Sequence, residues 1–142
     1  MKNRIIQRPA QVNGRVPFSS FQGKYLLAKQ FGNAGFYADV VLKVRVESGH
    51  DDVVITYPAD MAPDWQAAIG FGLAYAREHL PRDQRLGKRL SVEILSAKGH
   101  LVDTSTMTLA FAAAKALWNA MGCEGPPGFV LDAGTRAFHV PK

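Results

Sequence analysis

The sequence has 142 residues, of which 47% are hydrophobic and 20% are charged, a balance that excludes a disordered, collagen-like or coiled-coil chain. Its apolar runs fall short of the ~18 residues that span a bilayer, and its single cysteine excludes an internal disulfide and a cysteine-based zinc site. The formal net charge is +5, and residues 1–45 carry eight Lys and Arg against Asp39 alone, which favours an anionic partner such as nucleic acid.

The length matches one domain, and the first ten residues contain no apolar stretch of the kind that a secretory signal needs. We therefore expect a cytoplasmic protein that does not enter a membrane. Residues 9–142 are predicted to form a single domain, and residues 1–8 could form a flexible arm ahead of it.

The chain begins with weakly extended segments. Residues 10–18 and 24–30 are predicted as two strands, interrupted by Ser19, Ser20 and Gly23. A turn follows at residues 31–36, where glycines and an asparagine gather.

Residues 38–47 alternate cleanly between apolar and polar side chains, which predicts a strand with one face in the core. A turn at residues 48–52 leads to a short apolar strand at residues 53–57. These segments together are typical of an antiparallel meander with one buried and one solvated face.

A helix is predicted at residues 63–80, because Pro63 suits a first helical position, apolar residues follow at helical spacing and Pro81 stops it. Gly70 and Gly72 weaken this helix unless they allow close packing. A basic loop at residues 82–89 precedes another alternating strand at residues 89–96.

The second helix has the clearest pattern. Asp103, Thr104 and Ser105 offer an N-cap, with Asp103 expected in that role, and Gly122 stands where a left-handed C-cap residue belongs. Residues 129–140 could form a terminal hairpin. The order predicts an α+β fold in which two helices cover one face of an antiparallel sheet.

Two motifs lie in this framework in the same order as in domain IV of elongation factor G. Residues 23–37 are GKYLLAKQFGNAGFY, where that family has G-K-Y-A-R-Q-T-G-G-R-G-Q-Y-G-H-V. Residues 92–111 are VEILSAKGHLVDTSTMTLAF, where it has V-T-L-x-D-G-S-Y-H-x-V-D-S-S-E-M-A-F-K-I-A. Residues 9–12 (PAQV) add a shorter match. Over residues 9–121 the chain thus resembles the tRNA-mimicking arm of the translocase family.

The resemblance implies a left-handed split βαβ fold, shared with the second domain of ribosomal protein S5 and with the protein part of bacterial ribonuclease P. It also implies that two loops, at residues 31–37 and 97–103, form a tip that contacts RNA in the decoding region. His100 takes the position of the family's tip histidine, which is modified in eukaryotic relatives.

The departures limit what the resemblance implies. The sequence has no G-x-x-x-x-G-K-[ST] motif for binding nucleotide phosphates, so no GTPase is expected. The first loop has Asn33 and Ala34 where the family has an arginine, the second loop is one residue shorter, and Thr106 replaces a glutamate. Translocase activity is therefore not implied for this chain alone.

His100 and Asp103 could form a proton-transfer pair, contact RNA or have purely structural roles. The four histidines and Cys123 lack the spacing of metal ligands, so no metal and no cofactor is expected.

Basic residues on the solvated sheet face, with Arg15, could form a phosphate-binding stripe, and Tyr25, Phe36 and Tyr37 could stack on unpaired bases. The other interpretation is a solvated sheet face with core aromatics. The residues predicted to contact RNA, at the tip and on the strands, are Gly32, Asn33, Gly35, Tyr37, Lys98, Gly99, His100, Lys24, Lys29, Lys43 and Arg45.

We therefore expect a non-catalytic RNA- or ribosome-binding module. The alternative is a protein-interaction or self-association module that uses the open sheet face, with a second copy as one candidate partner. A small enzyme using His100 and Asp103 is a third, weaker hypothesis.

Overall fold

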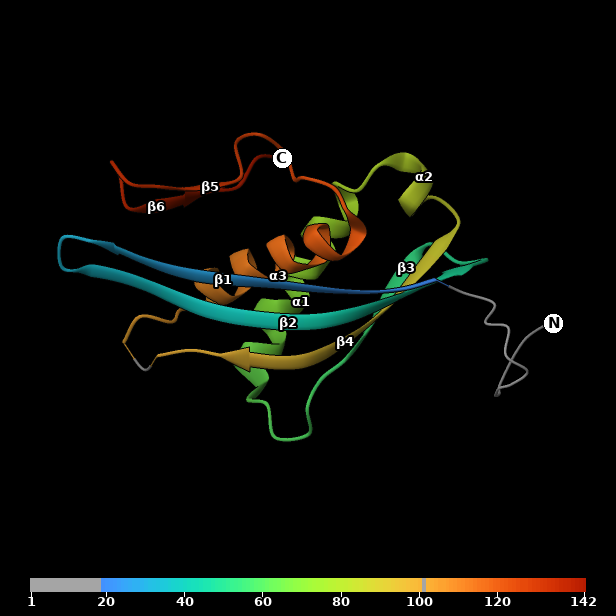
Figure 1. Ribbon diagram of the computed structural model, residues 1–142, viewed down its shortest axis with the longest axis horizontal. Helices are drawn as coiled ribbons and strands as arrows, with labels where there is room; N and C mark the ends of the chain where they lie inside the picture. Colours follow the sequence, from blue (N-terminus) through green and yellow to red (C-terminus); the bar gives the residue numbers. More distant parts are fainter. Residues whose placement is uncertain (1–18, 101) are drawn as a thin grey trace.

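A four-stranded sheet forms the base of the molecule. The computed structural model describes residues 19–100 and 102–142. The strands are β1 (Ser19–Phe31), β2 (Ala34–Ser48), β3 (Asp52–Thr56) and β4 (Lys88–Lys98), in the spatial order β1-β2-β4-β3 (Figure 1). β2 pairs antiparallel with β1 and β4, whereas β3 runs parallel to β4.

Two long helices cover one face of this sheet, α1 (Pro63–Glu78) and α3 (Thr106–Met121) (Figure 1). A single-turn helix, α2 (Arg82–Arg85), lies between α1 and β4 in the sequence. After α3 the chain forms a small hairpin of β5 (Val130–Asp132) and β6 (Ala137–His139). The fold is therefore α+β, with a mostly antiparallel sheet.

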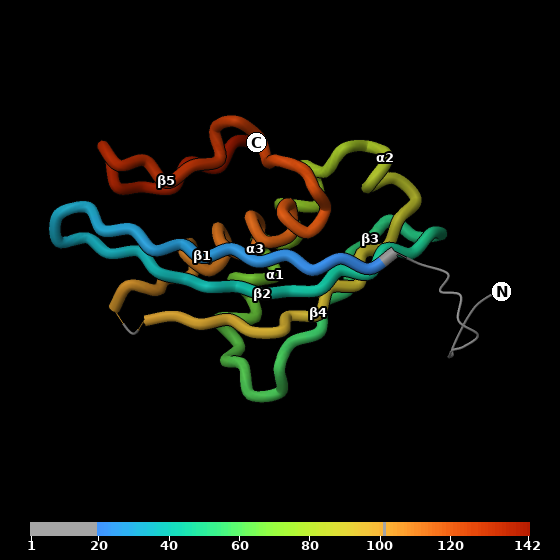
Figure 2. Tube along the Cα trace, in the orientation of Figure 1, coloured from blue at the N-terminus to red at the C-terminus, as the bar shows by residue number. Residues whose placement is uncertain are grey.

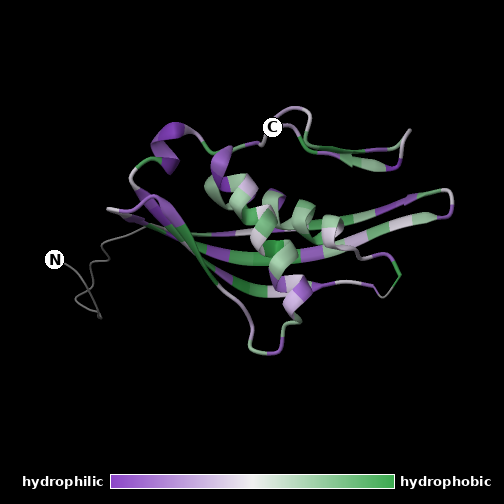
Figure 3. Ribbon diagram, turned by 180° about the vertical axis from the view of Figure 1, so that it is seen from behind, coloured by the Kyte–Doolittle hydropathy of each residue, from purple (hydrophilic) through white to green (hydrophobic). Residues whose placement is uncertain are grey.

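The core lies between the sheet and the two long helices, and Figure 3 shows hydrophobic residues recurring along these strands and helices. Val40, Leu42 and Val44 of β2 point into it and are fully buried, as the alternation of residues 38–47 predicted. Trp118 of α3 is also buried, and its indole Nε1 donates a hydrogen bond of 3.0 Å to the carbonyl oxygen of Ala76 in α1. That bond ties the two helices together.

Glycines allow the helices to approach their neighbours closely. A Cβ atom at Gly72 of α1 would lie 2.2 Å from the carbonyl oxygen of Ala110 in α3. A Cβ at Gly23 of β1 would lie 2.2 Å from the carbonyl oxygen of Ala116. Gly72 therefore supports packing of helix on helix, and Gly23, expected to interrupt a strand, lets β1 pass under α3.

The C-cap of α3 is the residue that the sequence predicted, whereas the N-cap differs from the prediction. Gly122 ends the helix with φ 70°, as predicted. The N-cap is Ser105, whose hydroxyl accepts a hydrogen bond from the backbone N–H of Thr108, and Thr108 returns the contact in a capping box. The prediction of Asp103 as the cap was wrong, because the chain turns into the helix two residues later.

The sheet corrects two further predictions. β1 is one continuous strand from Ser19, because pairing with β2 along its whole length outweighs the weak strand propensity of its serines and Gly23. The meander was wrong for β3, which pairs with β4 and not with β2. α1 connects β3 to β4 and returns the chain in the same direction, which a tight turn cannot do. The predicted strand at residues 10–18, Arg15 and the arm at residues 1–8 lie outside the described residues.

Within residues 19–100 and 102–142, none of the helices has the length and apolar character needed to cross a membrane.

Candidate functional site

Three connections meet at one end of the sheet, which we call the tip. They are the β1–β2 turn at residues 32–33, the segment between β4 and α3, and the β5–β6 turn at residues 133–136 (Figure 2). The first two correspond to the two loops that the sequence placed together.

Hydrogen bonds fasten the segment after β4 to β2. The backbone N–H of Tyr37 donates to the carbonyl oxygen of Asp103 (3.0 Å), and the hydroxyl of Thr104 donates to the carbonyl oxygen of Tyr37 (2.6 Å). The same hydroxyl accepts from the backbone N–H of His100 (2.7 Å). Thr104 thus links β2 to the segment after β4. The sequence analysis did not predict this role.

Two aromatic rings stack across this junction. The rings of Tyr37 and His100 lie 3.9 Å apart between centroids and within 3° of parallel. The His100 side chain is nevertheless 59% exposed. An exposed ring held parallel to a second ring is suited to stacking on a nucleic-acid base.

Two of the predicted glycines are required for packing. A Cβ at Gly35 would lie 2.7 Å from the carboxyl atoms of Asp103, and a Cβ at Gly99 would lie 2.5 Å from the hydroxyl oxygen of Thr104. Gly32 takes φ 64° in the two-residue β1–β2 turn, a conformation that glycine adopts at no steric cost. These glycines therefore shape the tip by letting its segments touch.

His100 and Asp103 do not form a hydrogen bond. The Nδ1 atom of His100 lies 3.9 Å from the nearer carboxylate oxygen of Asp103, too far for direct proton transfer. The hydroxyl of Ser105 is engaged with Thr108 in the capping box. The tip therefore offers a surface for contact and no assembled acid–base pair among its described residues.

The predicted strand residues divide between the two faces of the sheet. Lys24, Lys43 and Arg45 share the open face, by the register of β1 with β2. Lys29 lies on the opposite face, with Tyr25 and Leu27, so it does not join them. The open face is not purely basic, because Arg45 pairs with Glu47 (2.9 Å) and Lys43 lies across from Glu93 of β4.

Two of the three predicted stacking aromatics are used in packing. Tyr25 lies edge-on to Phe111 of α3, with 6.1 Å between ring centroids, and burial raises the pKa of its hydroxyl. Phe36 packs between Phe31 and Phe138, at 5.9 and 5.7 Å. Tyr37 is therefore the member of this group that lies beside a predicted contact residue.

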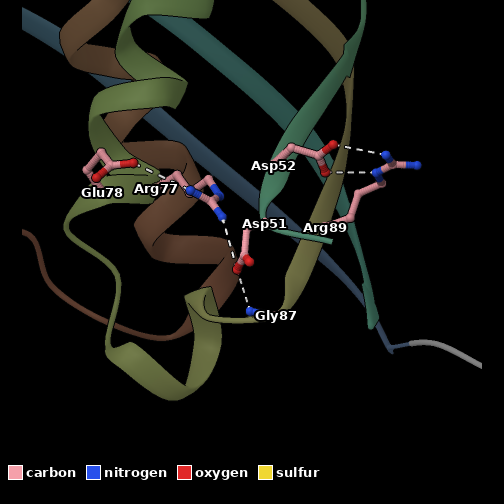
Figure 4. Close-up of polar contacts among 6 residues, drawn as sticks. All are labelled: Asp51, Asp52, Arg77, Glu78, Gly87 and Arg89. Carbon is pink, nitrogen blue, oxygen red and sulfur yellow. Dashed lines mark hydrogen bonds and ion pairs between the residues drawn. The ribbon is translucent and has the colours of Figure 1, made fainter. Parts of the chain in front are cut away.

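The other end of the sheet holds ion pairs (Figure 4). Arg89 of β4 donates two hydrogen bonds, of 2.8 and 2.9 Å, to the carboxylate of Asp52 in β3. This interaction lowers the pKa of Asp52 and raises that of Arg89. Arg77 of α1 lies between Asp51 (3.9 Å) and Glu78 (3.4 Å). The basic stretch predicted as a loop is thus partly helical, as α2 (Arg82–Arg85), and its last residue, Arg89, is paired with Asp52.

Sequence reasoning also missed Arg136 in the β5–β6 turn, whose guanidinium lies against Gly32. No local signal could place it there, because the contact joins segments about a hundred residues apart. In the part of the chain that the structure describes, no three His, Cys, Asp or Glu side chains gather as metal ligands would.

Comparison with known proteins identifies the fold only in part. No protein-family model matches the chain, and no curated protein matches it. A crystal structure of a protein from Thermus thermophilus is similar, with 25% sequence identity and a TM-score of 0.54. The match covers 76% of this chain and 17% of the Thermus chain. This protein is therefore similar in fold to one portion of a much longer bacterial protein.

Proposed function

We propose that the protein is a non-catalytic RNA- or ribosome-binding module with the left-handed split βαβ fold of elongation factor G domain IV. It acts in the cytoplasm, and it has no GTPase or translocase activity of its own. The strand order β1-β2-β4-β3, with α1 between the parallel strands β3 and β4 and α3 after β4, is compatible with that fold.

The observation that carries this proposal is the assembly of the tip. Seven of the eleven predicted contact residues lie at the tip. Gly32, Asn33, Gly99 and His100 belong to its first two segments, and Gly35, Tyr37 and Lys98 lie at the adjoining ends of β2 and β4. The stacked pair of Tyr37 and His100 presents an exposed ring, and Lys98 adds an exposed cation next to it in the sequence. An aromatic surface beside a cation is the usual means of contacting unpaired nucleotides.

The test is binding of the purified protein to ribosomal subunits, tRNA and a random single-stranded RNA at two salt concentrations. The Lys98→Ala/His100→Ala variant should bind more weakly, and its affinity should depend less on salt, by about one phosphate contact. A variant with Arg82→Ala and Lys88→Ala, at the far end of the molecule, is the control and should bind as the wild type does. Absence of binding at low salt would contradict the proposal.

The open sheet face supports the alternative function. Leu26 and Val54 are 56% and 45% exposed, and both lie on the side of the sheet that the helices leave bare. An apolar group on an uncovered sheet is typical of a surface that binds a protein or a second copy. Self-association that is insensitive to salt and is lost in a Leu26→Lys/Val54→Lys variant would favour this function over RNA binding. Sedimentation velocity measures it.

A further inference from the structure

We infer that Arg136 forms a phosphate-binding site with the β1–β2 turn, and that this site holds the RNA backbone beside the tip. The inference rests on the proposed function and names a contact that the two tip loops do not supply. Arg136 belongs to the C-terminal hairpin, beyond residues 9–121, the segment that resembles domain IV.

The backbone of Arg136 is strained. Its φ is 57°, and it is the one residue other than glycine with a positive φ among those the structure describes. A long side chain pays a steric penalty in this region, and such outliers gather at functional sites. The backbone N–H of Arg136 donates to the carbonyl oxygen of Asp132 (2.7 Å), which closes the turn in this conformation.

The strained turn directs the guanidinium to the tip. A Cβ atom on Gly32 would lie 2.8 Å from Nη2 of Arg136 and 3.4 Å from its Cζ. The guanidinium therefore rests on the Cα of a glycine, and any larger residue at position 32 would displace it. Gly32 thus has two reasons to be glycine, its own positive φ and this contact.

The hairpin that carries Arg136 is docked firmly. Phe138 of β6 packs against Phe36 of β2 and Phe111 of α3, with ring centroids 5.7 and 5.0 Å apart. The hydroxyl of Tyr75 in α1 donates a hydrogen bond to the carbonyl oxygen of Pro141, just after β6. Arg136 is therefore held over the β1–β2 turn by a packed element.

The guanidinium lacks an anionic partner within the described residues. The carboxylate in the same hairpin, Asp132, accepts from the backbone N–H of Gly134 (2.8 Å) and lies 3.5 Å from His139. Asp103, the acidic residue of the neighbouring segment, packs its carboxylate on Gly35. Arg136 is exposed, and a planar guanidinium is suited to binding a phosphate group.

Arg136→Gly tests the site, because glycine accepts φ 57° without strain and the variant loses the guanidinium together with the rest of the side chain. In fluorescence anisotropy with a labelled single-stranded RNA, we expect several-fold weaker binding and a log–log salt slope smaller by about 0.7. Arg136→Lys should keep the slope and lose part of the affinity, because lysine keeps the charge but not the planar donors. Arg82→Ala in α2 removes the same charge at the other end and should change neither quantity.

A second readout separates this inference from the proposed function. We expect inorganic phosphate to shift the amide signal of Gly32 and the Nε signal of Arg136 in the nuclear magnetic resonance spectrum of the wild type, and not the Gly32 signal in Arg136→Gly. If the wild type binds RNA and Arg136→Gly binds equally with the same slope, the inference is wrong and the proposed function stands. If the wild type binds no RNA, the proposed function is wrong. The phosphate shifts then support the anion site, and their absence overturns it.

Discussion

At the scale of single residues, the tip depends on two glycines whose lack of a side chain allows close contacts. Gly35 and Gly99 have no side chains where Asp103 and Thr104 pack, and the hydrogen bonds of Thr104 require that close approach. A methyl group added at Gly99 would push the segment after β4 away from β2, and one added at Gly35 would displace the carboxylate of Asp103. The first displacement would separate Tyr37 from His100, whose rings are 3.9 Å apart. Stability and binding are therefore coupled at these positions.

Gly35→Ala should destabilise the protein by about 1–3 kcal/mol, the usual cost of inserting an atom into a packed site. The new Cβ would lie 2.7 Å from three carboxyl atoms of Asp103. Asp103→Ala removes those atoms, so the double variant should recover most of the loss. Urea denaturation of the two single variants and the double variant measures this coupling.

Gly134→Ala is the control for Gly35→Ala, because its Cβ would meet only the end of the Asp132 side chain, at 3.3 Å. We expect a much smaller effect there. Additive losses in the double variant of Gly35 and Asp103 would contradict the close contact at the tip.

At the scale of elements, local patterns predicted β2, α1 and α3 well. Residues 38–47 alternate strictly, and the apolar stripe of α3 runs without a break to Gly122. The start of β1 was missed because Ser19, Ser20 and Gly23 have low strand propensity, and the pairing with β2 that overrides this is not visible locally. The partner of β3 could not be predicted either, because topology decides it.

In the candidate site, too, local motifs could be predicted and contacts between distant segments could not. The two loops of the tip could be found from motifs, since each is a contiguous string of residues. Arg136 could not, because the packing of Phe138 on Phe36 and Phe111 brings its hairpin to the tip. Lys29 was grouped with Lys24, but the two are five residues apart in β1, and the alternation of side chains along a strand places them on opposite faces.

The parallel pairing of β3 with β4 should make stability depend on pH through Asp52. Hydrogen bonds from Arg89 lower the pKa of Asp52 in the folded protein. Its contribution is therefore present above the unfolded pKa, near 4, and is lost as the pH falls through the folded value. We expect Asp52→Asn to melt below the wild type at pH 7, with the difference closing as the pH falls below 4.

Thermal melts of the wild type and Asp52→Asn between pH 7 and pH 2 measure this dependence. Asp60→Asn, at an exposed position between β3 and α1, serves as the matched control and should follow the wild type throughout. A difference between Asp52→Asn and the wild type that stays constant down to pH 2 would contradict the role of the ion pair.

At the scale of the whole molecule, the long sheet separates two ends with different chemistry. The tip holds an exposed ring and the cations of Lys98 and Arg136, whereas at the other end Arg77 and Arg89 are paired with Asp51, Asp52 and Glu78 (Figures 1 and 4). Helices close one face, and the open face mixes both signs of charge with a few exposed apolar side chains. Binding at the tip would therefore leave the open face available to a second partner.

The intrinsic fluorescence of Trp118 should report on the packing of α1 against α3. Its indole is 1% exposed, is hydrogen-bonded to Ala76 of α1 and packs edge-on against Phe129, at 4.8 Å. Trp65, at the start of α1, is only partly buried. The emission of Trp118 should lie at short wavelength and resist quenching by solutes in water for as long as α1 and α3 stay together. A red shift would then signal separation of the helices, which allows folding to be followed without any label.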